Sequence, residues 1–219
     1  MCKFLRFIGI LFLSISALFN IASGAGTTCV ALNPTGFGAT FAPIANSQWL
    51  YILFVLVTLA FGIMMAWAVF LVTKGRENAY RYAMISMTGA LLVGVLHMIV
   101  SRNLRGSSMP VDGVVYTTLL TLVIFLLFKI PGVWAKVDFT LATKKDSDLA
   151  GGAAAIVCGI LSLTIQYLMA PSHTIGGVNY GDAFHLTATG IGWGLVLVGS
   201  VFILSRVVIL TEKAVSETI

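Results

Sequence analysis

The chain has 219 residues, of which 58% are apolar and 10% are charged, and its formal net charge is +5. About a quarter of the residues in a soluble globular domain are charged, so the composition and the mean hydropathy of +1.00 exclude a soluble fold for most of the chain. The 13 lysines and arginines are spread between apolar segments and form no basic patch, which argues against nucleic acid as a partner.

The apolar residues are grouped into runs of twenty or so, which is the length that crosses a bilayer as a helix. Within hydrocarbon every backbone N–H and C=O group needs an internal partner, so a spanning segment is either a helix or part of a closed barrel. Barrel strands are shorter and alternate in polarity. The sequence therefore predicts an all-α integral membrane protein whose solvent is the lipid bilayer.

The N-terminal residues have the order of a secretory signal. Lys3 and Arg6 precede an apolar stretch over residues 7–19, and the small residues 22–25 follow it. This order is typical of a cleaved signal peptide, which we predict for residues 1–25. The alternative is an uncleaved signal anchor, which adds one more helix to the bundle. Residues 26–47 are rich in Gly, Thr, Ala and Pro and are predicted to form an extracytoplasmic loop or short hairpin.

Five further segments are long enough to cross about 30 Å of hydrocarbon. We place them at residues 48–72, 80–100, 113–130, 149–169 and 183–204. They form a predicted bundle of five transmembrane helices in a domain over residues 48–212. If the leader is uncleaved, it adds a sixth helix to this bundle. A cytoplasmic tail at 213–219 follows this domain. The charged residues 144–148 are interpreted as a solvated turn before the fourth of these segments.

The distribution of lysine and arginine among the loops also predicts the orientation of the chain in the membrane. With the mature N-terminus outside, Arg102 and Arg105 face outward and the other nine beyond the leader face inward. These nine are Lys74, Arg76, Arg81, Lys129, Lys136, Lys144, Lys145, Arg206 and Lys213. The positive-inside rule then predicts a multi-pass protein of the cytoplasmic membrane with a cytoplasmic C-terminus. Tyr51 and other aromatic residues near the predicted outer boundary are interpreted as an interfacial belt.

All three histidines, His97, His173 and His185, fall on the predicted outer side. His97 lies inside a spanning segment, about one turn from its end. An ionisable group there is costly unless it is paired, hydrated or functional. One interpretation is a hydrogen-bonded histidine near the interface. Another is a residue that transfers protons, because imidazole titrates near neutral pH.

A cofactor is a further alternative. His97 and His185 lie on different predicted helices at comparable depth and could provide the two axial ligands of one haem b. Metal binding by all three histidines is the weaker alternative, because nothing in their spacing imposes a tetrahedral site. The leading expectation is that the chain binds no cofactor.

The predicted outer loop over residues 102–110 carries two arginines against the charge rule. They are interpreted either as contacts with anionic headgroups or as a docking site for a partner or substrate. Asp112 and Asp182, which lie on the same predicted side, are their candidate ion-pair partners.

Small residues recur every four positions on two predicted helices. Gly151, Ala155 and Gly159 share one face, and Gly190 and Gly194 share another. Small side chains let helix backbones approach closely in lipid. These faces predict packing inside the bundle or an interface with another subunit.

The sequence contains no nucleophile elbow or other catalytic signature, so we do not expect an enzyme. The leading hypothesis is a non-catalytic subunit of a larger membrane complex. In this hypothesis the Gly/Ala helix faces and the arginine loop contact other membrane subunits. Two alternatives remain open: an ion or small-solute transporter with a polar point at His97, and a single-haem electron carrier that uses His97 and His185.

Overall fold

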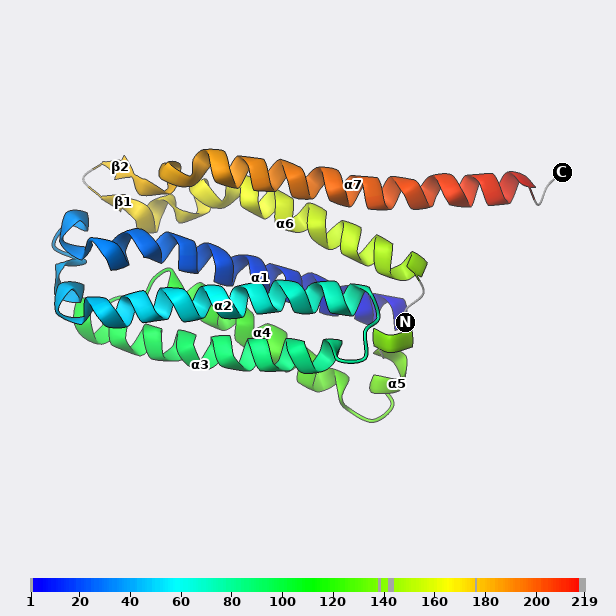
Figure 1. The fold of residues 1–219 in the computed structure, drawn as a ribbon, viewed down its shortest axis with the longest axis horizontal. Helices are drawn as coiled ribbons and strands as arrows, with labels where there is room; N and C mark the ends of the chain where they lie inside the picture. Colours follow the sequence, from blue (N-terminus) through cyan, green and yellow to red (C-terminus); the bar gives the residue numbers. More distant parts are fainter. Residues whose placement is uncertain (1, 138, 142–143, 176, 217–219) are drawn as a thin grey trace.

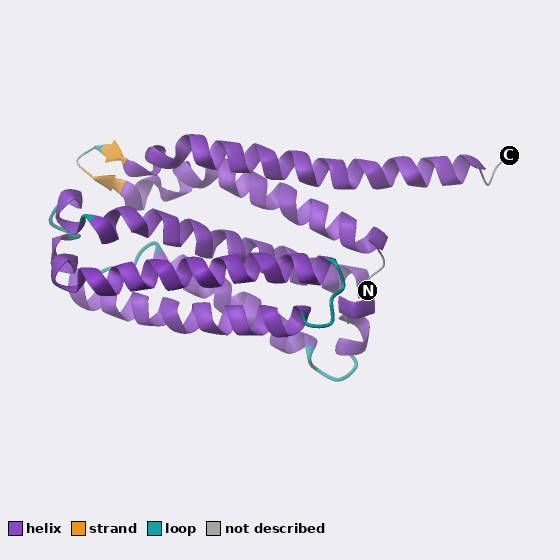
Figure 2. Ribbon diagram, viewed as in Figure 1, coloured by secondary structure: helices purple, strands orange, loops and turns teal. Residues whose placement is uncertain are grey.

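The fold is described from a computed structural model, which covers residues 2–137, 139–141, 144–175 and 177–216. As predicted, the described chain is almost entirely helical (Figure 2). The long helices are α1 (Cys2–Leu32), α2 (Gln48–Thr73), α3 (Ala79–Arg105), α4 (Val111–Phe128), α6 (Lys144–His173) and α7 (His185–Ser216). All 6 contain a stretch that is long and apolar enough to span a membrane. The protein is therefore a multi-pass membrane protein.

Short elements join the long helices. Two 3-10 helices, η1 (Pro34–Phe37) and η2 (Ala42–Ser47), connect α1 to α2. Between α4 and α6 lie α5 (Trp134–Val137) and η3 (Phe139–Leu141). Between α6 and α7 lie β1 (Thr174–Ile175), β2 (Val178–Asn179) and η4 (Tyr180–Phe184), and the two strands pair antiparallel.

The long helices run side by side (Figure 1). The α1–α2, α3–α4 and α6–α7 connections lie at one end, which we call the connection end. Both ends of the described chain approach the opposite end, which we call the terminal end. Helix α1 packs along α2, α2 along α3, and α3 along α4, and α4 returns to α1. These four helices form a closed bundle.

Helices α6 and α7 form a hairpin beside this bundle. They pack extensively on each other, and α6 also packs against α1. Among the described elements, α7 has extensive contacts with α6 and with η4 alone. In Figure 1 the hairpin and α3 lie on opposite sides of the α1–α2 pair.

The four-helix bundle is held together by close backbone approach and by an apolar core. A Cβ added at Gly62 of α2 would lie 3.0 Å from the backbone nitrogen of Ile21 on α1. One added at Gly24 of α1 would lie 2.6 Å from Leu59 Cγ on α2. Glycine at these positions brings α1 and α2 together, which is how helices associate where lipid provides no hydrophobic driving force.

The prediction that residues 26–47 lack a long helix is wrong for residues 26–32. Helix α1 passes through the predicted cleavage region without a break and ends at Leu32. The Thr28 hydroxyl donates to the Gly24 carbonyl at 2.9 Å, so this polar side chain is satisfied within the helix. Ala31 is buried against the η2 region. Packing against neighbouring elements therefore outweighs the weak helix propensity of this segment.

The predicted spans are confirmed, but four helix ends lie several residues beyond the predicted ones, among them the C-terminal end of α6, which reaches His173 and not residue 169. Helix α3 continues to Arg105, five residues past the predicted end at residue 100. Helix α6 begins at Lys144, so the prediction of a solvated turn at 144–148 is wrong. Helix α7 continues to Ser216, which makes most of the predicted tail helical. Residues 217–219 of that tail lie outside the described residues.

Candidate functional site

His97 lies in the interior of the four-helix bundle. Its side chain is 5% exposed, its ring stacks on Phe54 with 4.7 Å between centroids, and the ring of Tyr51 meets it edge-on at 5.2 Å. Because α3 extends to Arg105, His97 is about two turns inside the helix rather than the predicted one. The aromatic contacts come from α2 and orient the imidazole between the helices.

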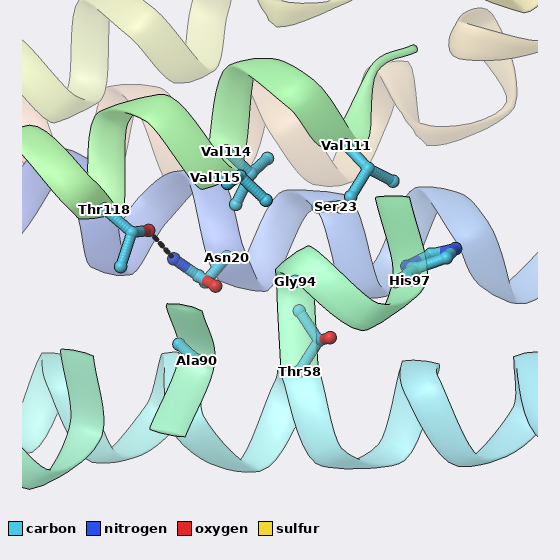
Figure 3. A pocket seen from close by; sticks show the side chains of 10 residues that line it. All are labelled: Asn20, Ser23, Thr58, Ala90, Gly94, His97, Val111, Val114, Val115 and Thr118. Carbon is cyan, nitrogen blue, oxygen red and sulfur yellow. Dashed lines mark hydrogen bonds between the residues drawn. The ribbon is translucent and has the colours of Figure 1, made fainter. Parts of the chain in front are cut away.

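A small cavity adjoins His97. Its volume is about 10 Å³, and residues of α1, α2, α3 and α4 line it. Figure 3 shows the lining side chains, among them the polar residues Asn20, Ser23, Thr58 and Thr118. The volume is near the lower limit for one water molecule, and such a water needs two to four polar partners. The lining can supply them.

Hydrogen bonds continue from this cavity toward the terminal end. Asn20 Nδ2 donates to Thr118 Oγ1 at 3.0 Å (Figure 3) and to the Ser16 carbonyl at 2.8 Å. Ser16 Oγ and Thr121 Oγ1 are 2.7 Å apart. The bonds to Thr118 and Thr121 join α1 to α4 at membrane depth, where an interhelical hydrogen bond contributes about 0.6–2 kcal/mol. We call these side chains and His97 the polar seam: Ser16, Asn20, Thr118, Thr121 and His97.

The polar seam extends toward the connection end through a pair that joins α2 to α3. Tyr51 Oη and Ser101 Oγ are 2.7 Å apart, and both side chains are buried. The interpretation of Tyr51 as a belt residue is therefore wrong, because its hydroxyl has a partner inside the bundle. Toward the terminal end the seam stops at an apolar cluster. Ile10, Leu13 and Phe125 in this cluster are all 0% exposed.

The arginine loop, the segment over residues 102–110, begins with the last turn of α3 rather than with the predicted loop, and its arginines bond within their own chain. Arg102 Nη2 lies 3.1 Å from Asp112 Oδ2, and Arg102 Nε donates to Ser108 Oγ at 2.8 Å. The Ser108 hydroxyl in turn donates to Asp112 Oδ1. The predicted ion pair between one of the two arginines and Asp112 is confirmed. Asp182 lies in η4, where its carboxylate accepts a hydrogen bond from Asn179 at 3.4 Å.

Arg105 is placed differently from Arg102. Its Nη2 donates to the Met109 carbonyl at 2.7 Å, and its Cζ lies 4.9 Å from the centre of the Phe41 ring. Among the described buried side-chain nitrogens and oxygens, Arg105 Nε is the one with no hydrogen-bond partner. Arg105 also lines the large crevice described next.

A crevice of about 630 Å³ runs along α1 and is lined by α1, the α6–α7 hairpin, the start of α4 and a few residues of α2 and α3. Most of its lining is apolar, from residues such as Leu18, Val30, Ile165 and Leu195. The polar side chains in the described lining include Gln166, His173, His97 and Arg105, and this lining contains no carboxylate. Its volume falls in the range of sites for small molecules, about 300–1,000 Å³.

The three histidines differ in their nearest contacts. Beyond the spanning stretch of α6, His173 Nδ1 lies 3.2 Å from the Met169 carbonyl, and burial lowers the pKa of its imidazole. His185 opens α7, as predicted, and its Nδ1 is hydrogen-bonded to Gln166 Oε1. His97 lies on α3 and lines the same crevice as His173 and Gln166. The described residues contain no group of three metal-binding side chains, and the haem hypothesis stays a prediction.

The small residues divide into packed and open positions. A Cβ added at Gly159 would lie 2.7 Å from the Gly192 carbonyl oxygen on α7, so this position packs inside the hairpin. Gly151 faces Thr73 of α2, with 3.3 Å from such a Cβ to Thr73 Cγ2, and Ala155 lines the crevice. Gly190 and Gly194 have no described atom within 4 Å of an added Cβ. The small-residue face of α6 is thus packed inside the protein, whereas that of α7 is open.

Several residues of the polar seam were not predicted. Asn20 falls within the predicted signal peptide, yet it is 1% exposed and bonded to α4. A signal was present, because an amide four residues after Ser16 lies on the same helix face.

The sequence matches no protein-family model, and comparisons with curated proteins and with solved structures return no match.

Proposed function

We propose that this chain is a non-catalytic subunit of a larger membrane assembly and that a transmembrane helix of a partner protein packs on α7. The supporting observation is the open face of α7. The spanning stretch of α7 is 11% buried, whereas the other spanning stretches are 28–39% buried. Its extensive contacts among the described elements are with α6 and η4 alone.

The glycines of this face favour a protein neighbour over lipid. A glycine inside a helix is less favourable than alanine by about 1 kcal/mol, and a lipid-facing position gains nothing from it. Where a second helix packs, the missing side chain allows close backbone approach. Gly190 and Gly194 lie one helical turn apart with open space beside them, and Trp193 next to them is 55% exposed.

The arginine loop is the weaker of the two proposed contacts, because Arg102 is already paired with Asp112.

Leucine at Gly190 or Gly194 is expected to release the partner without unfolding the chain, because each new side chain enters open space. The measurement is native mass spectrometry of the complex extracted from its own membrane in mild detergent, with the thermal unfolding midpoint of the purified chain alongside. Ala60→Leu, at an exposed position of α2, is the matched control and should keep the partner. Recovery of the wild-type protein as a single chain of monomer mass would contradict the proposal.

We propose the cytoplasmic membrane as its location, with the terminal end on the cytoplasmic side. Of the 13 lysines and arginines, Arg102 and Arg105 belong to the connection end. The other 11 belong to the N-terminal region, the α2–α3 and α4–α6 connections and the C-terminal part of α7, all toward the opposite end. This bias is the one that the positive-inside rule describes.

We further propose that α1 is retained as the first transmembrane helix and is not removed as a signal peptide. A leader that is removed does not need polar side chains that form hydrogen bonds with later helices. Ser16 and Asn20 are matched to Thr121 and Thr118 of α4, and Arg6 Nη2 donates to the Phe139 carbonyl at 3.2 Å.

A second candidate function is transport of protons through the polar seam, with His97 as the titrating point. The observation that favours it is the cavity beside His97, which is lined by Asn20, Thr58 and Thr118. The apolar cluster at the terminal end closes the other half of the bundle, so transport requires that half to open.

If the seam carries protons, vesicles containing the purified chain should acidify under an imposed proton gradient, and His97→Phe should abolish this flux. Phenylalanine keeps the stacking on Phe54 while removing the titratable ring nitrogens. The measurement is the fluorescence of a pH-sensitive dye trapped in the vesicles. His185→Phe, outside the seam, should retain the flux. A flux equal to that of protein-free vesicles would rule this function out.

A further inference from the structure

We infer that the crevice along α1 binds one anionic phospholipid, with an acyl chain between α1 and the α6–α7 hairpin and the phosphate beside Arg105, which α3 contributes to the lining. This site is separate from the open face of α7 and does not depend on the proposed partner.

The shape of the crevice fits an acyl chain. On α1 its lining runs from Ser14 to Val30, which is about 24 Å at the rise of 1.5 Å per residue. On α6 the lining covers Gly151 to His173. A cavity that is long and parallel to the helices follows the direction of lipid chains in the bilayer. Its length exceeds half of the roughly 30 Å hydrocarbon core, so it can hold a chain from one leaflet.

The charge of the lining selects the headgroup. Arg105 is the one lysine or arginine in the described lining, which contains no aspartate or glutamate. A guanidinium at the headgroup end of an apolar cavity favours an acidic group. Arg105 ends α3 and adjoins Phe41 of the α1–α2 connection, so it lies at the connection end of the crevice. A molecule with an anionic head and a hydrocarbon tail matches both parts of the lining.

Arg105 also has donor capacity that the chain leaves unused. Its Nη2 is engaged by the Met109 carbonyl, while its Nε has no partner among the described residues. An unpaired buried donor costs about 1–3 kcal/mol. A phosphate oxygen would accept from Nε, and hydrogen bonds between arginine and phosphate are among the strong ones. Arg102, three residues earlier, already donates to Ser108 and to Asp112.

The test measures lipid binding to the purified full chain in detergent by native mass spectrometry. Phosphatidylglycerol and phosphatidylcholine with identical acyl chains are added at equal concentrations. We expect the anionic lipid to bind about tenfold more tightly, which corresponds to 1.4 kcal/mol. Arg105→Gln should remove this preference, whereas Arg102→Gln, the matched control, should retain it. Ala155→Phe, which fills the crevice, should weaken the binding of both lipids.

Three outcomes would overturn the inference. Equal binding of the two lipids to the wild-type chain removes the role of charge, and this comparison decides the question even if Arg105→Gln does not fold. An equal loss in Arg102→Gln and Arg105→Gln points to general surface charge. Full displacement of phosphatidylglycerol by glycerol 3-phosphate at the same concentration shows a site for a free phosphate ester and not for a lipid.

Discussion

Replacing Gly199 with leucine is expected to separate α6 from α7 and to give one of the largest losses of stability in this chain. A Cβ at this position would overlap the Gly152 carbonyl oxygen and would lie 3.1 Å from the Ile156 backbone nitrogen, both on α6. Backbone atoms cannot rotate away as a side chain does. Overpacking costs about 1–3 kcal/mol, and we expect the upper end of this range.

Thermal unfolding in detergent measures this effect. At about 2–4 °C per kcal/mol for a chain of this size, the midpoint of Gly199→Leu should fall by roughly 6–12 °C. Gly194→Leu is the internal control, because it adds the same side chain to the same helix in open space. The midpoint of this control should stay unchanged or rise slightly through helix propensity. Equal midpoints for the two variants would show that α6 and α7 do not pack as described.

Gly62→Leu is expected to destabilise the chain by a similar amount, and this result depends on the presence of α1. The added Cβ would lie 2.8 Å from Ile21 Cγ1 and 3.3 Å from the Asn20 carbonyl carbon. If signal peptidase removed residues 1–25, both neighbours would be absent and leucine would enter lipid. The unfolding midpoint of Gly62→Leu therefore reports whether α1 is part of the mature protein.

The intact mass of the mature protein provides the direct check. We expect a mass that includes α1, together with a lowered midpoint for Gly62→Leu. Ala60→Leu, at an exposed position two residues earlier, should leave the midpoint unchanged. A mature protein that begins near residue 26 and an unaffected Gly62→Leu variant would together show that α1 is a cleaved leader.

The number and position of the later spans could be predicted because lipid imposes a simple requirement on sequence. Apolar runs such as 48–72 have no other way to satisfy their backbone than a spanning helix. The ends of these helices were less predictable. Charged residues such as Lys144 and Arg105 continue a helix past the apolar stretch, where hydropathy no longer reports structure.

A contact of the candidate site could be predicted where a charged residue has few possible partners of opposite charge. Arg102 had few acidic partners on its side of the membrane, and its pairing with Asp112 is confirmed. The role of Asn20 was not predicted, because a signal peptide and a retained first helix share the same apolar pattern. The difference lies in the partner Thr118, 98 residues away, and a single sequence does not report which distant helices meet.

The bond between Asn20 and Thr118 also has a consequence for biosynthesis. The two residues are separated by 98 positions, which a ribosome translates in about 5–20 s at 5–20 residues per second. During this interval α1 is in the membrane while the amide of Asn20 lacks its later partner. The contact of Gly24 with Leu59 and that of Gly62 with Ile21 need α2 alone, so the α1–α2 pair forms early and holds α1 in place until α4 is inserted.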